Sequence, residues 1–180
     1  MSIFLLVHGA WHSGRCWQRV VPLLESAGHQ VHAPSLTGYG DKAHLLGPDV
    51  GLDTHVADVI ELIKDKDLTN VVLVGHSYAG LVISAAANEI PDRIAHLVYL
   101  DAMVPEDGET AVDVQPISQR LIDFAAQSGS GWRIPRCPSS RRLSACSESP
   151  TRRTSPGSAR CSRINRCVAC SNRSAWTIRP

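Results

Sequence analysis

One hexapeptide constrains the fold of this 180-residue chain more than any other feature: Gly75-His76-Ser77-Tyr78-Ala79-Gly80. It follows an apolar run, Val71–Val74, which predicts a strand buried on both faces, and it precedes a helical pattern that continues to about Glu89. In such a G-x-S-x-G pattern the serine lies on a tight, strained turn from strand to helix, with its hydroxyl exposed above the sheet. The two outer glycines leave room where the turn crowds neighbouring backbone. The pattern therefore predicts an α/β architecture in which Ser77 is a nucleophile.

The first 125 residues show the alternation that such an architecture needs. Short β-branched runs alternate with helical periodicity, which is typical of a parallel sheet covered by helices. We expect strands over 3–7, 30–33, 71–74 and 94–100, and helices over 17–27, from 53 or 54 to 63, and over 78–89. The stretch 34–52 is rich in glycine, proline and polar residues and is expected to be a loop. The predicted fold class is a doubly wound, mostly parallel α/β sheet.

A second motif, Val7-His8-Gly9-Ala10, stands at the end of the first predicted strand. Acyl transfer needs two backbone N–H donors that point at the developing oxyanion. One donor comes from the residue after the nucleophile, here Tyr78, and the other comes from the loop after the first strand, here Ala10. The two motifs together predict an oxyanion hole formed by these two amides.

These motifs resemble the α/β-hydrolase superfamily, and the segments 4–12 and 22–29 resemble its esterase and hydroxynitrile-lyase branch. The resemblance covers roughly residues 3–125. It implies a serine hydrolase with Ser77 as nucleophile, Ala10 and Tyr78 as oxyanion donors, and a cap that begins within 103–124. In the lyases a threonine follows the first-strand histidine and an acidic residue precedes the nucleophile. Here Gly9 and His76 occupy those positions, so the pattern resembles the esterases.

A catalytic base is not evident, because none of the eight histidines lies beyond residue 96. In this fold the base follows both the nucleophile and the acid in the sequence. We interpret His96, at the start of a predicted strand, as structural, and we interpret His8 and His76 as residues that shape the oxyanion loop. A role as base for either of these two would depart from the family pattern.

Asp101 is the candidate catalytic acid, because it ends a predicted strand, where some α/β-hydrolases place this residue. The more usual position follows the next strand, which the sequence does not show. The alternative is that the Asp101 carboxylate caps the following turn.

The last 48 residues differ in composition from the rest of the chain. Residues 1–132 hold 7 basic and 16 acidic residues, a net charge of −9, whereas residues 133–180 hold 11 arginines and one acid, a net charge of +10. Leucine, isoleucine, valine and phenylalanine make up only 5 of those last 48 residues, too few for a core of their own. We therefore expect residues 1–128 to form the N-terminal part of a hydrolase domain with the start of its cap. We expect residues 129–180 to form a disordered, basic tail, so that the α/β-hydrolase fold is incomplete. The composition of this tail is typical of the product of a truncated or frameshifted gene.

The tail suggests neither a metal site nor specific nucleic-acid binding. Its last cysteines have spacings that fit no common zinc-ligand pattern: Cys146, Cys161, Cys167 and Cys170. Its arginines are scattered with little aromatic interleaving beyond Trp176, so any binding to polyanions would be non-specific. We expect no metal and no organic cofactor.

Two functions of different classes remain open. The first is a carboxylic ester hydrolase that acts on a small-molecule ester by acyl transfer to Ser77 and is impaired because it lacks a late histidine. The second is a non-catalytic, truncated remnant that binds small acyl compounds or anionic partners. The sequence shows no signal peptide and no apolar stretch near the ~20 residues of a membrane helix, so we expect a cytoplasmic protein without membrane contact.

Overall fold

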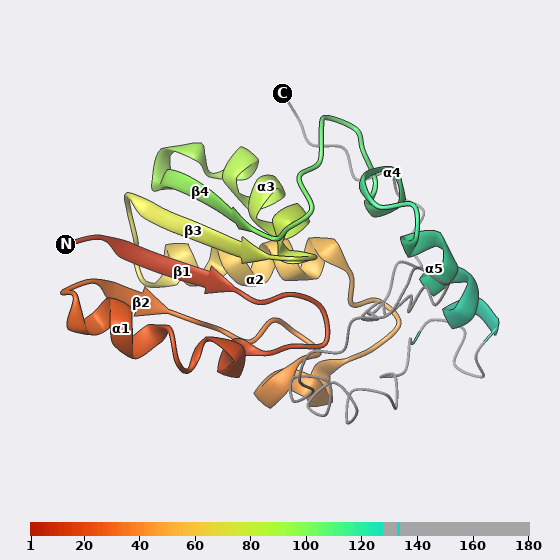
Figure 1. Ribbon diagram of the computed structural model, residues 1–180, viewed down its shortest axis with the longest axis horizontal. Helices are drawn as coiled ribbons and strands as arrows, with labels where there is room; N and C mark the ends of the chain where they lie inside the picture. The colour runs from red at the N-terminus through yellow and green to blue at the C-terminus, as the bar shows by residue number, and fades with distance from the viewer. Residues whose placement is uncertain (128–132, 134–180) are drawn as a thin grey trace, which may run out of the picture.

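The computed structural model describes residues 1–127 and residue 133 of the chain (Figure 1). Its centre is a four-stranded sheet in the order β2-β1-β3-β4, in which every neighbouring pair of strands is parallel. The strands are β1 (Ile3–Val7), β2 (Gln30–His32), β3 (Val71–His76) and β4 (Ile94–Leu100). The fold class and all four strands are therefore as predicted, and β3 extends two residues further, into the hexapeptide.

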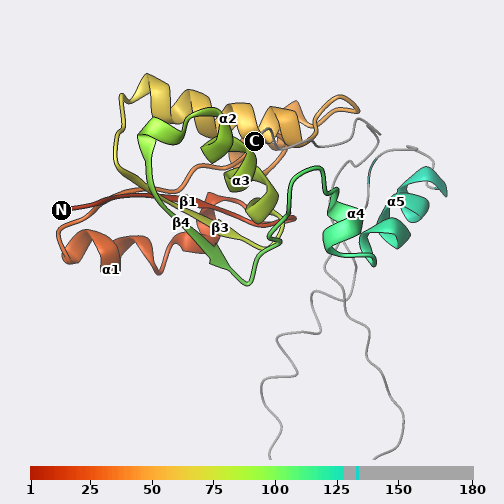
Figure 2. The same cartoon turned by 90° about the horizontal axis from the view of Figure 1, so that it is seen from above.

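Helices cover both faces of the sheet, as the doubly wound prediction requires. Helix α1 (Val21–Ser26) lies on one face, whereas α2 (Leu52–Asp65) and α3 (Ala79–Glu89) lie on the other (Figure 2). Two further helices, α4 (Ala111–Val114) and α5 (Ser118–Gln127), lie beyond the carboxyl ends of the strands. They occupy the stretch in which a cap is predicted to begin. Short 3-10 helices occur at Gly14–Trp17, Gly40–Leu45 and Pro91–Arg93.

Two predicted boundaries were wrong, and proline explains the first of them. The helix expected over 17–27 is divided into the 3-10 turn Gly14–Trp17 and the shorter α1, which has Pro22 in its first turn. Proline has no N–H to donate, so it is tolerated at the start of a helix and not inside it. The loop expected over 34–52 contains a 3-10 helix and ends at Leu52, where α2 begins.

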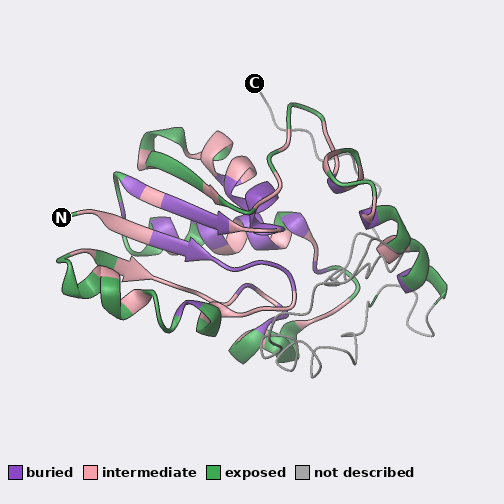
Figure 3. Cartoon of the chain, viewed as in Figure 1, coloured by how far each residue is buried: buried purple, intermediate pink, exposed green. Residues whose placement is uncertain are grey.

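The larger hydrophobic core lies between the sheet and the α2–α3 layer. It joins β1 and β3 to the buried face of α2, where the predicted periodicity is confirmed by the burial of Val56, Val59, Ile60 and Ile63. A smaller cluster lies on the α1 side and contains Leu6, Trp17 and Val74. The two clusters fix β1 and β3 as the buried centre of the sheet (Figure 3).

The described residues include no helix that is long and apolar enough to span a bilayer.

Strand β4 is the exposed edge of the described sheet. Within residues 1–127 it pairs only with β3, and three of its apolar side chains are accessible to solvent: Leu97 at 36%, Val98 at 40% and Leu100 at 48%. The sequence analysis predicts no strand after residue 100, so it predicts an unpaired edge here. An edge strand with accessible apolar side chains is a template for pairing with another chain.

We expect the protein to associate with itself through β4 at micromolar concentrations. Val98→Lys should raise the proportion of monomer in sedimentation velocity experiments, because a charged side chain on an edge strand opposes strand pairing. Leu23→Lys is the matched control, since Leu23 is 69% exposed on α1, away from this edge. A wild-type protein that stays monomeric over the whole concentration range would contradict the prediction.

Candidate active site

Three of the five non-glycine residues that have a positive φ within the described residues follow neighbouring strands of the sheet, and the other two, Asp67 and Asn70, lie in the loop before β3. Trp11 follows β1 with φ of 60°, Ser77 follows β3 directly with φ of 56°, and Asp101 follows β4 directly with φ of 47°. Residues with a side chain rarely adopt this left-handed region, and such strain gathers at functional sites. Because β1, β3 and β4 are adjacent and parallel, these three positions lie at the same edge of the sheet.

Ser77 lies on the strained strand-to-helix turn that its motif predicts. Its backbone N–H donates to the Leu100 carbonyl over 3.4 Å, and its own carbonyl accepts from the Met103 N–H over 3.0 Å. Both glycines of the motif are needed for packing. A Cβ on Gly75 would lie 2.8 Å from the Ala79 carbonyl oxygen, and a Cβ on Gly80 would collide with the carbonyl oxygen of Met103. The segment after β4 is therefore held against the first turn of α3.

The loop after β1 packs directly against this turn. A Cβ on Gly9 would lie 2.8 Å from His76 Nδ1 and 2.9 Å from both the His76 carbonyl oxygen and Ser77 Cβ. Only a glycine therefore permits this approach without movement of the backbone. The structure thus brings together the two segments that carry the predicted oxyanion donors, with Ala10 and Tyr78 both buried.

His8 is fully buried and holds the start of this loop through both of its ring nitrogens. Its Nδ1 donates to the Gly9 carbonyl over 2.8 Å, and its Nε2 accepts from the Leu36 N–H over 3.0 Å. Burial lowers the pKa of His8 to about 4, so the imidazole is neutral near pH 7. Both ring nitrogens of His8 are thus bound to backbone groups, and the sequence analysis interprets this residue as one that shapes the oxyanion loop.

His12 and His76 lie beside each other next to this turn, and both are half-buried. Their ring centroids are 5.7 Å apart with the planes nearly perpendicular, and His12 Nδ1 donates to the Ala10 carbonyl over 2.8 Å. Burial lowers the pKa of His76, the neighbouring His12 lowers it further, and the Asp101 carboxylate opposes both effects. Asp101 itself is exposed at the end of β4. Among the predicted residues, His96 stands apart, because it lies opposite Val72 near the beginning of β3.

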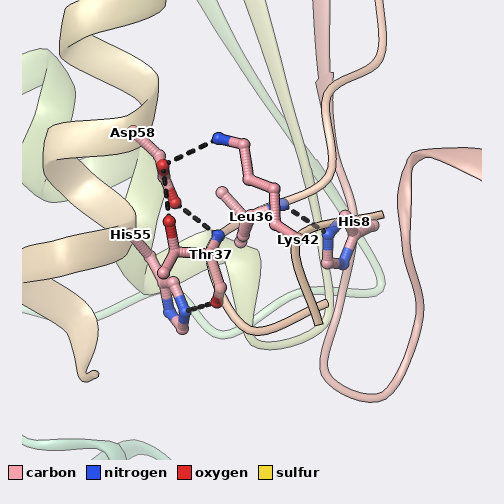
Figure 4. A network of polar contacts seen from close by, with 6 residues as sticks. All are labelled: His8, Leu36, Thr37, Lys42, His55 and Asp58. Atoms are coloured by element: carbon pink, nitrogen blue, oxygen red, sulfur yellow. Dashed lines mark hydrogen bonds and ion pairs between the residues drawn. The ribbon is translucent and has the colours of Figure 1, made fainter. Parts of the chain in front are cut away.

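A buried histidine that the sequence analysis left without a role lies beside Tyr78. The Tyr78 hydroxyl and His55 Nδ1 are 2.9 Å apart, and His55 Nε2 is 3.0 Å from the Thr37 carbonyl oxygen (Figure 4 shows His55 with Thr37). Its place on α2 gives a signal that could have found it. His55 shares the buried face of that helix with Leu52, Val56 and Val59, so a polar side chain there must have buried partners.

No group of three or more histidine, cysteine or acidic side chains within the described residues could hold a metal ion. The cysteines considered for zinc, and all of the predicted basic tail except residue 133, lie outside the described residues.

Replacing Ser77 should show that the turn is strained. Ser77→Gly should be more stable to urea unfolding than Ser77→Ala by about 1 kcal/mol, because glycine adopts a positive φ without the steric cost that a Cβ brings. Both variants lack the hydroxyl, so each serves as the control for the other. An alanine variant as stable as the glycine variant would mean that the turn stores no strain.

Acid should destabilise the fold through His8. Its pKa is lower in the folded protein than in the unfolded chain, so its contribution to stability is complete above about pH 6.5 and is lost progressively as the pH falls toward about 4. A shift of this size corresponds to about 3 kcal/mol. The free energy of unfolding, measured with urea from pH 7.5 to 4.5, should fall less steeply for His8→Gln than for wild type. An equal fall of the free energy of unfolding with pH in wild type and His8→Gln would contradict the lowered pKa of His8.

Comparison with known proteins agrees with this geometry. Residues 4–176 match the model of the alpha/beta hydrolase family. The chain is 48% identical over 116 residues to a carbendazim hydrolyzing esterase from Nocardioides sp. (strain SG-4G), which covers 64% of this chain and 48% of that protein. It is 38% identical over 104 residues to an alpha-hydroxynitrile lyase from Arabidopsis thaliana, which covers 57% of this chain and 40% of that protein.

A solved structure shows the same likeness in three dimensions. An extracellular alpha/beta-hydrolase from a Paenibacillus species superposes with a TM-score of 0.61 at 30% identity, over 73% of this chain and 54% of that one. The chain thus spans about half the length of the relatives it matches. The matched family, the parallel sheet and the serine turn agree, and the chain belongs to the alpha/beta hydrolase family.

Proposed function

We propose that this chain is a serine hydrolase that acts on small-molecule carboxylic esters by transferring the acyl group to Ser77. One observation carries the proposal: Ser77 lies on a strained turn between β3 and α3, in contact distance of the Gly9-Ala10 loop. A nucleophile and two candidate oxyanion donors therefore meet at one edge of the sheet. The relatives of this chain include a protein named as an esterase, which supports ester chemistry.

The chemistry begins with attack of the Ser77 hydroxyl oxygen on the ester carbonyl carbon. The carbonyl oxygen becomes an oxyanion, which the amides of Ala10 and Tyr78 stabilise. Collapse of the tetrahedral intermediate leaves an acyl group on Ser77 and releases the alcohol, whose oxygen takes up the proton that the Ser77 hydroxyl has lost. Water then attacks this acyl group to release the carboxylic acid and restore the serine hydroxyl.

Proton transfer is the weak step of this scheme. The residues C-terminal to His96 include no histidine, and His8 has both ring nitrogens bound to backbone. Removing one member of a Ser-His-acid triad costs about 10⁴- to 10⁶-fold in rate, whereas the oxyanion hole and substrate binding alone retain roughly 10³- to 10⁴-fold over water. We therefore propose that the chain acylates slowly and turns over poorly.

Asp101 is the acid that we propose for this site. It follows β4 directly, at the same edge of the sheet as Ser77, and its backbone is strained. The alternative role, as a cap of the following turn, requires only its backbone neighbours. Asp101→Asn distinguishes the two, because asparagine keeps a side-chain oxygen that can cap the turn but lacks the carboxylate. A slower acylation with unchanged unfolding would support the acid, whereas no change in either would support the turn cap.

The second candidate function is a remnant that binds small acyl compounds or anionic partners without catalysis. The observation that favours it is the missing late histidine together with the eleven arginines of residues 133–180. In that case an ester would bind near Ser77 without forming a covalent bond. We keep the domain division at residues 1–128 and 129–180 as part of either proposal.

Acylation of Ser77 can be measured with p-nitrophenyl acetate. We expect release of about one equivalent of p-nitrophenol for each chain, followed by a rate far below the order of 10 per second that is ordinary for enzymes. A fluorophosphonate probe should label wild type and not Ser77→Ala. Ser84→Ala is the matched control, since Ser84 is another serine nearby, on helix α3. Its hydroxyl forms hydrogen bonds with the Gly80 carbonyl and the Tyr99 hydroxyl.

Three results would change the proposal. Equal labelling of wild type and Ser77→Ala would exclude Ser77 as the nucleophile. Ordinary esterase turnover that depends on Ser77 would show that another residue serves as the base. Saturable binding of the ester without any release of alcohol would favour the non-catalytic remnant.

A further inference from the structure

We propose that Tyr78, His55 and the pair Leu36-Thr37 form a hydrogen-bonded brace that positions both oxyanion amides at once. The inference rests on the proposed function, since it assigns positioning residues to the same site. None of these side chains needs to touch the substrate. Their contacts join the residue after the nucleophile to the loop that carries Ala10. Figure 4 shows the middle of this arrangement, from His55 through Thr37 and Leu36 to His8.

The first half of the brace begins at Tyr78. A carbonyl oxygen only accepts hydrogen bonds, so His55 Nε2, 3.0 Å from the Thr37 carbonyl, must carry the ring proton. His55 Nδ1 is then an acceptor, and the Tyr78 hydroxyl donates to it over 2.9 Å. Burial lowers the pKa of His55, although the Thr37 contact and Asp58 oppose this, so the neutral ring is the form present near pH 7.

The second half begins one residue earlier, at Leu36. Its N–H donates to His8 Nε2 over 3.0 Å, and His8 Nδ1 donates to the Gly9 carbonyl over 2.8 Å. Gly9 directly precedes Ala10, the other predicted oxyanion donor. The polar contacts therefore run from Tyr78 through His55, Thr37, Leu36 and His8 to the residue before Ala10.

Thr37 is fixed from a second direction by the helix that carries His55. Asp58 lies three residues after His55 on α2, so both side chains project from the same face of that helix. The Asp58 carboxylate accepts from the Thr37 N–H over 2.6 Å and from its hydroxyl over 2.9 Å. Lys42 pairs with the same carboxylate over 3.0 Å. Helix α2 thus holds the backbone of Thr37 at both its N–H and its carbonyl.

The burial of these groups argues that the arrangement is rigid. His8 and His55 are at most 2% exposed and Tyr78 is 9% exposed, so unmade hydrogen bonds there would leave polar atoms without water. The rings also contact one another through Tyr39, whose centroid lies 5.1 Å from that of His8 and 5.6 Å from that of His55. An oxyanion hole depends on donors that are fixed before the charge develops, and this packing supplies that order.

The test compares the amide signals and the reactivity of three variants. Tyr78→Phe removes the hydroxyl that donates to His55. His55→Leu removes the hydrogen bonds of both ring nitrogens, and Asp58→Ala removes the carboxylate that accepts from Thr37. Tyr99→Phe is the matched control, because it removes another tyrosine hydroxyl bond, to Ser84 over 2.7 Å, outside the brace. His55→Asn is the rescue variant, since an asparagine oxygen can accept from Tyr78 at the position of Nδ1.

Spectroscopy gives a readout that does not depend on activity. Long-range ¹H–¹⁵N spectra of wild type should place the His55 proton on Nε2. Tyr78→Phe and His55→Leu should both shift the amide signal of Ala10, whereas Tyr99→Phe should leave it unchanged. An Ala10 amide signal that is unchanged in both Tyr78→Phe and His55→Leu, or a His55 proton on Nδ1, would overturn the brace whether or not Ser77 reacts.

Reactivity gives the second readout. The rate of the p-nitrophenol burst should fall about 10-fold in Tyr78→Phe and in His55→Leu, and by no more than about 10-fold in the double variant, because residues of one network are not additive. His55→Asn should recover part of the loss, and Asp58→Ala should lower the rate without contact to either amide. Single-variant effects that multiply to about 100-fold in the double variant would contradict a common brace.

A separate outcome distinguishes the brace from the proposed function. If wild type does not react with p-nitrophenyl acetate, but both brace variants still shift the Ala10 amide signal, the proposed function is refuted and the brace remains as a structural unit.

Discussion

The parallel pairing of β1, β3 and β4 is the constraint on which the rest of the structure depends. It places the ends of three strands side by side, so that the loop after β1 meets the serine turn after β3 and the segment after β4 crosses the start of α3. Both contacts are close enough to require a glycine: Gly9 where the loop after β1 packs on the serine turn, and Gly80 where the segment after β4 packs on α3. The buried contacts of β1 and β3 with α2 and α3 stabilise this geometry against the strain at Ser77.

Histidine serves this site through hydrogen bonds more than through charge. His8 and His55 are buried and neutral, and each connects two backbone or hydroxyl groups that are distant in sequence. A neutral imidazole suits this role because one nitrogen donates and the other accepts. The same two hydrogen bonds occupy both ring nitrogens of His8, so neither nitrogen is available for proton transfer in the proposed reaction.

Much of the fold and part of the site could be predicted from local sequence patterns. Apolar periodicity located the strands and α2, and the hexapeptide predicted the strain at Ser77, because each of these signals lies within a few adjacent residues. The strain at Trp11 and the partners of His55 could not be predicted in this way. The partners of His55 belong to segments more than fifteen residues away in sequence, at Thr37 and Tyr78, which no local pattern encodes. The positive φ of Trp11 has no motif in the sequence that would indicate it.

The central claim is that Ser77 forms a covalent acyl intermediate at this edge of the sheet. Intact mass spectrometry after brief exposure to p-nitrophenyl acetate, followed by peptide mapping, tests it most directly. The account predicts one acetyl group for each chain, on the peptide that contains Ser77, and none on the Ser77→Ala variant. An unmodified wild-type chain, or an acetyl group on another residue in both proteins, would contradict it.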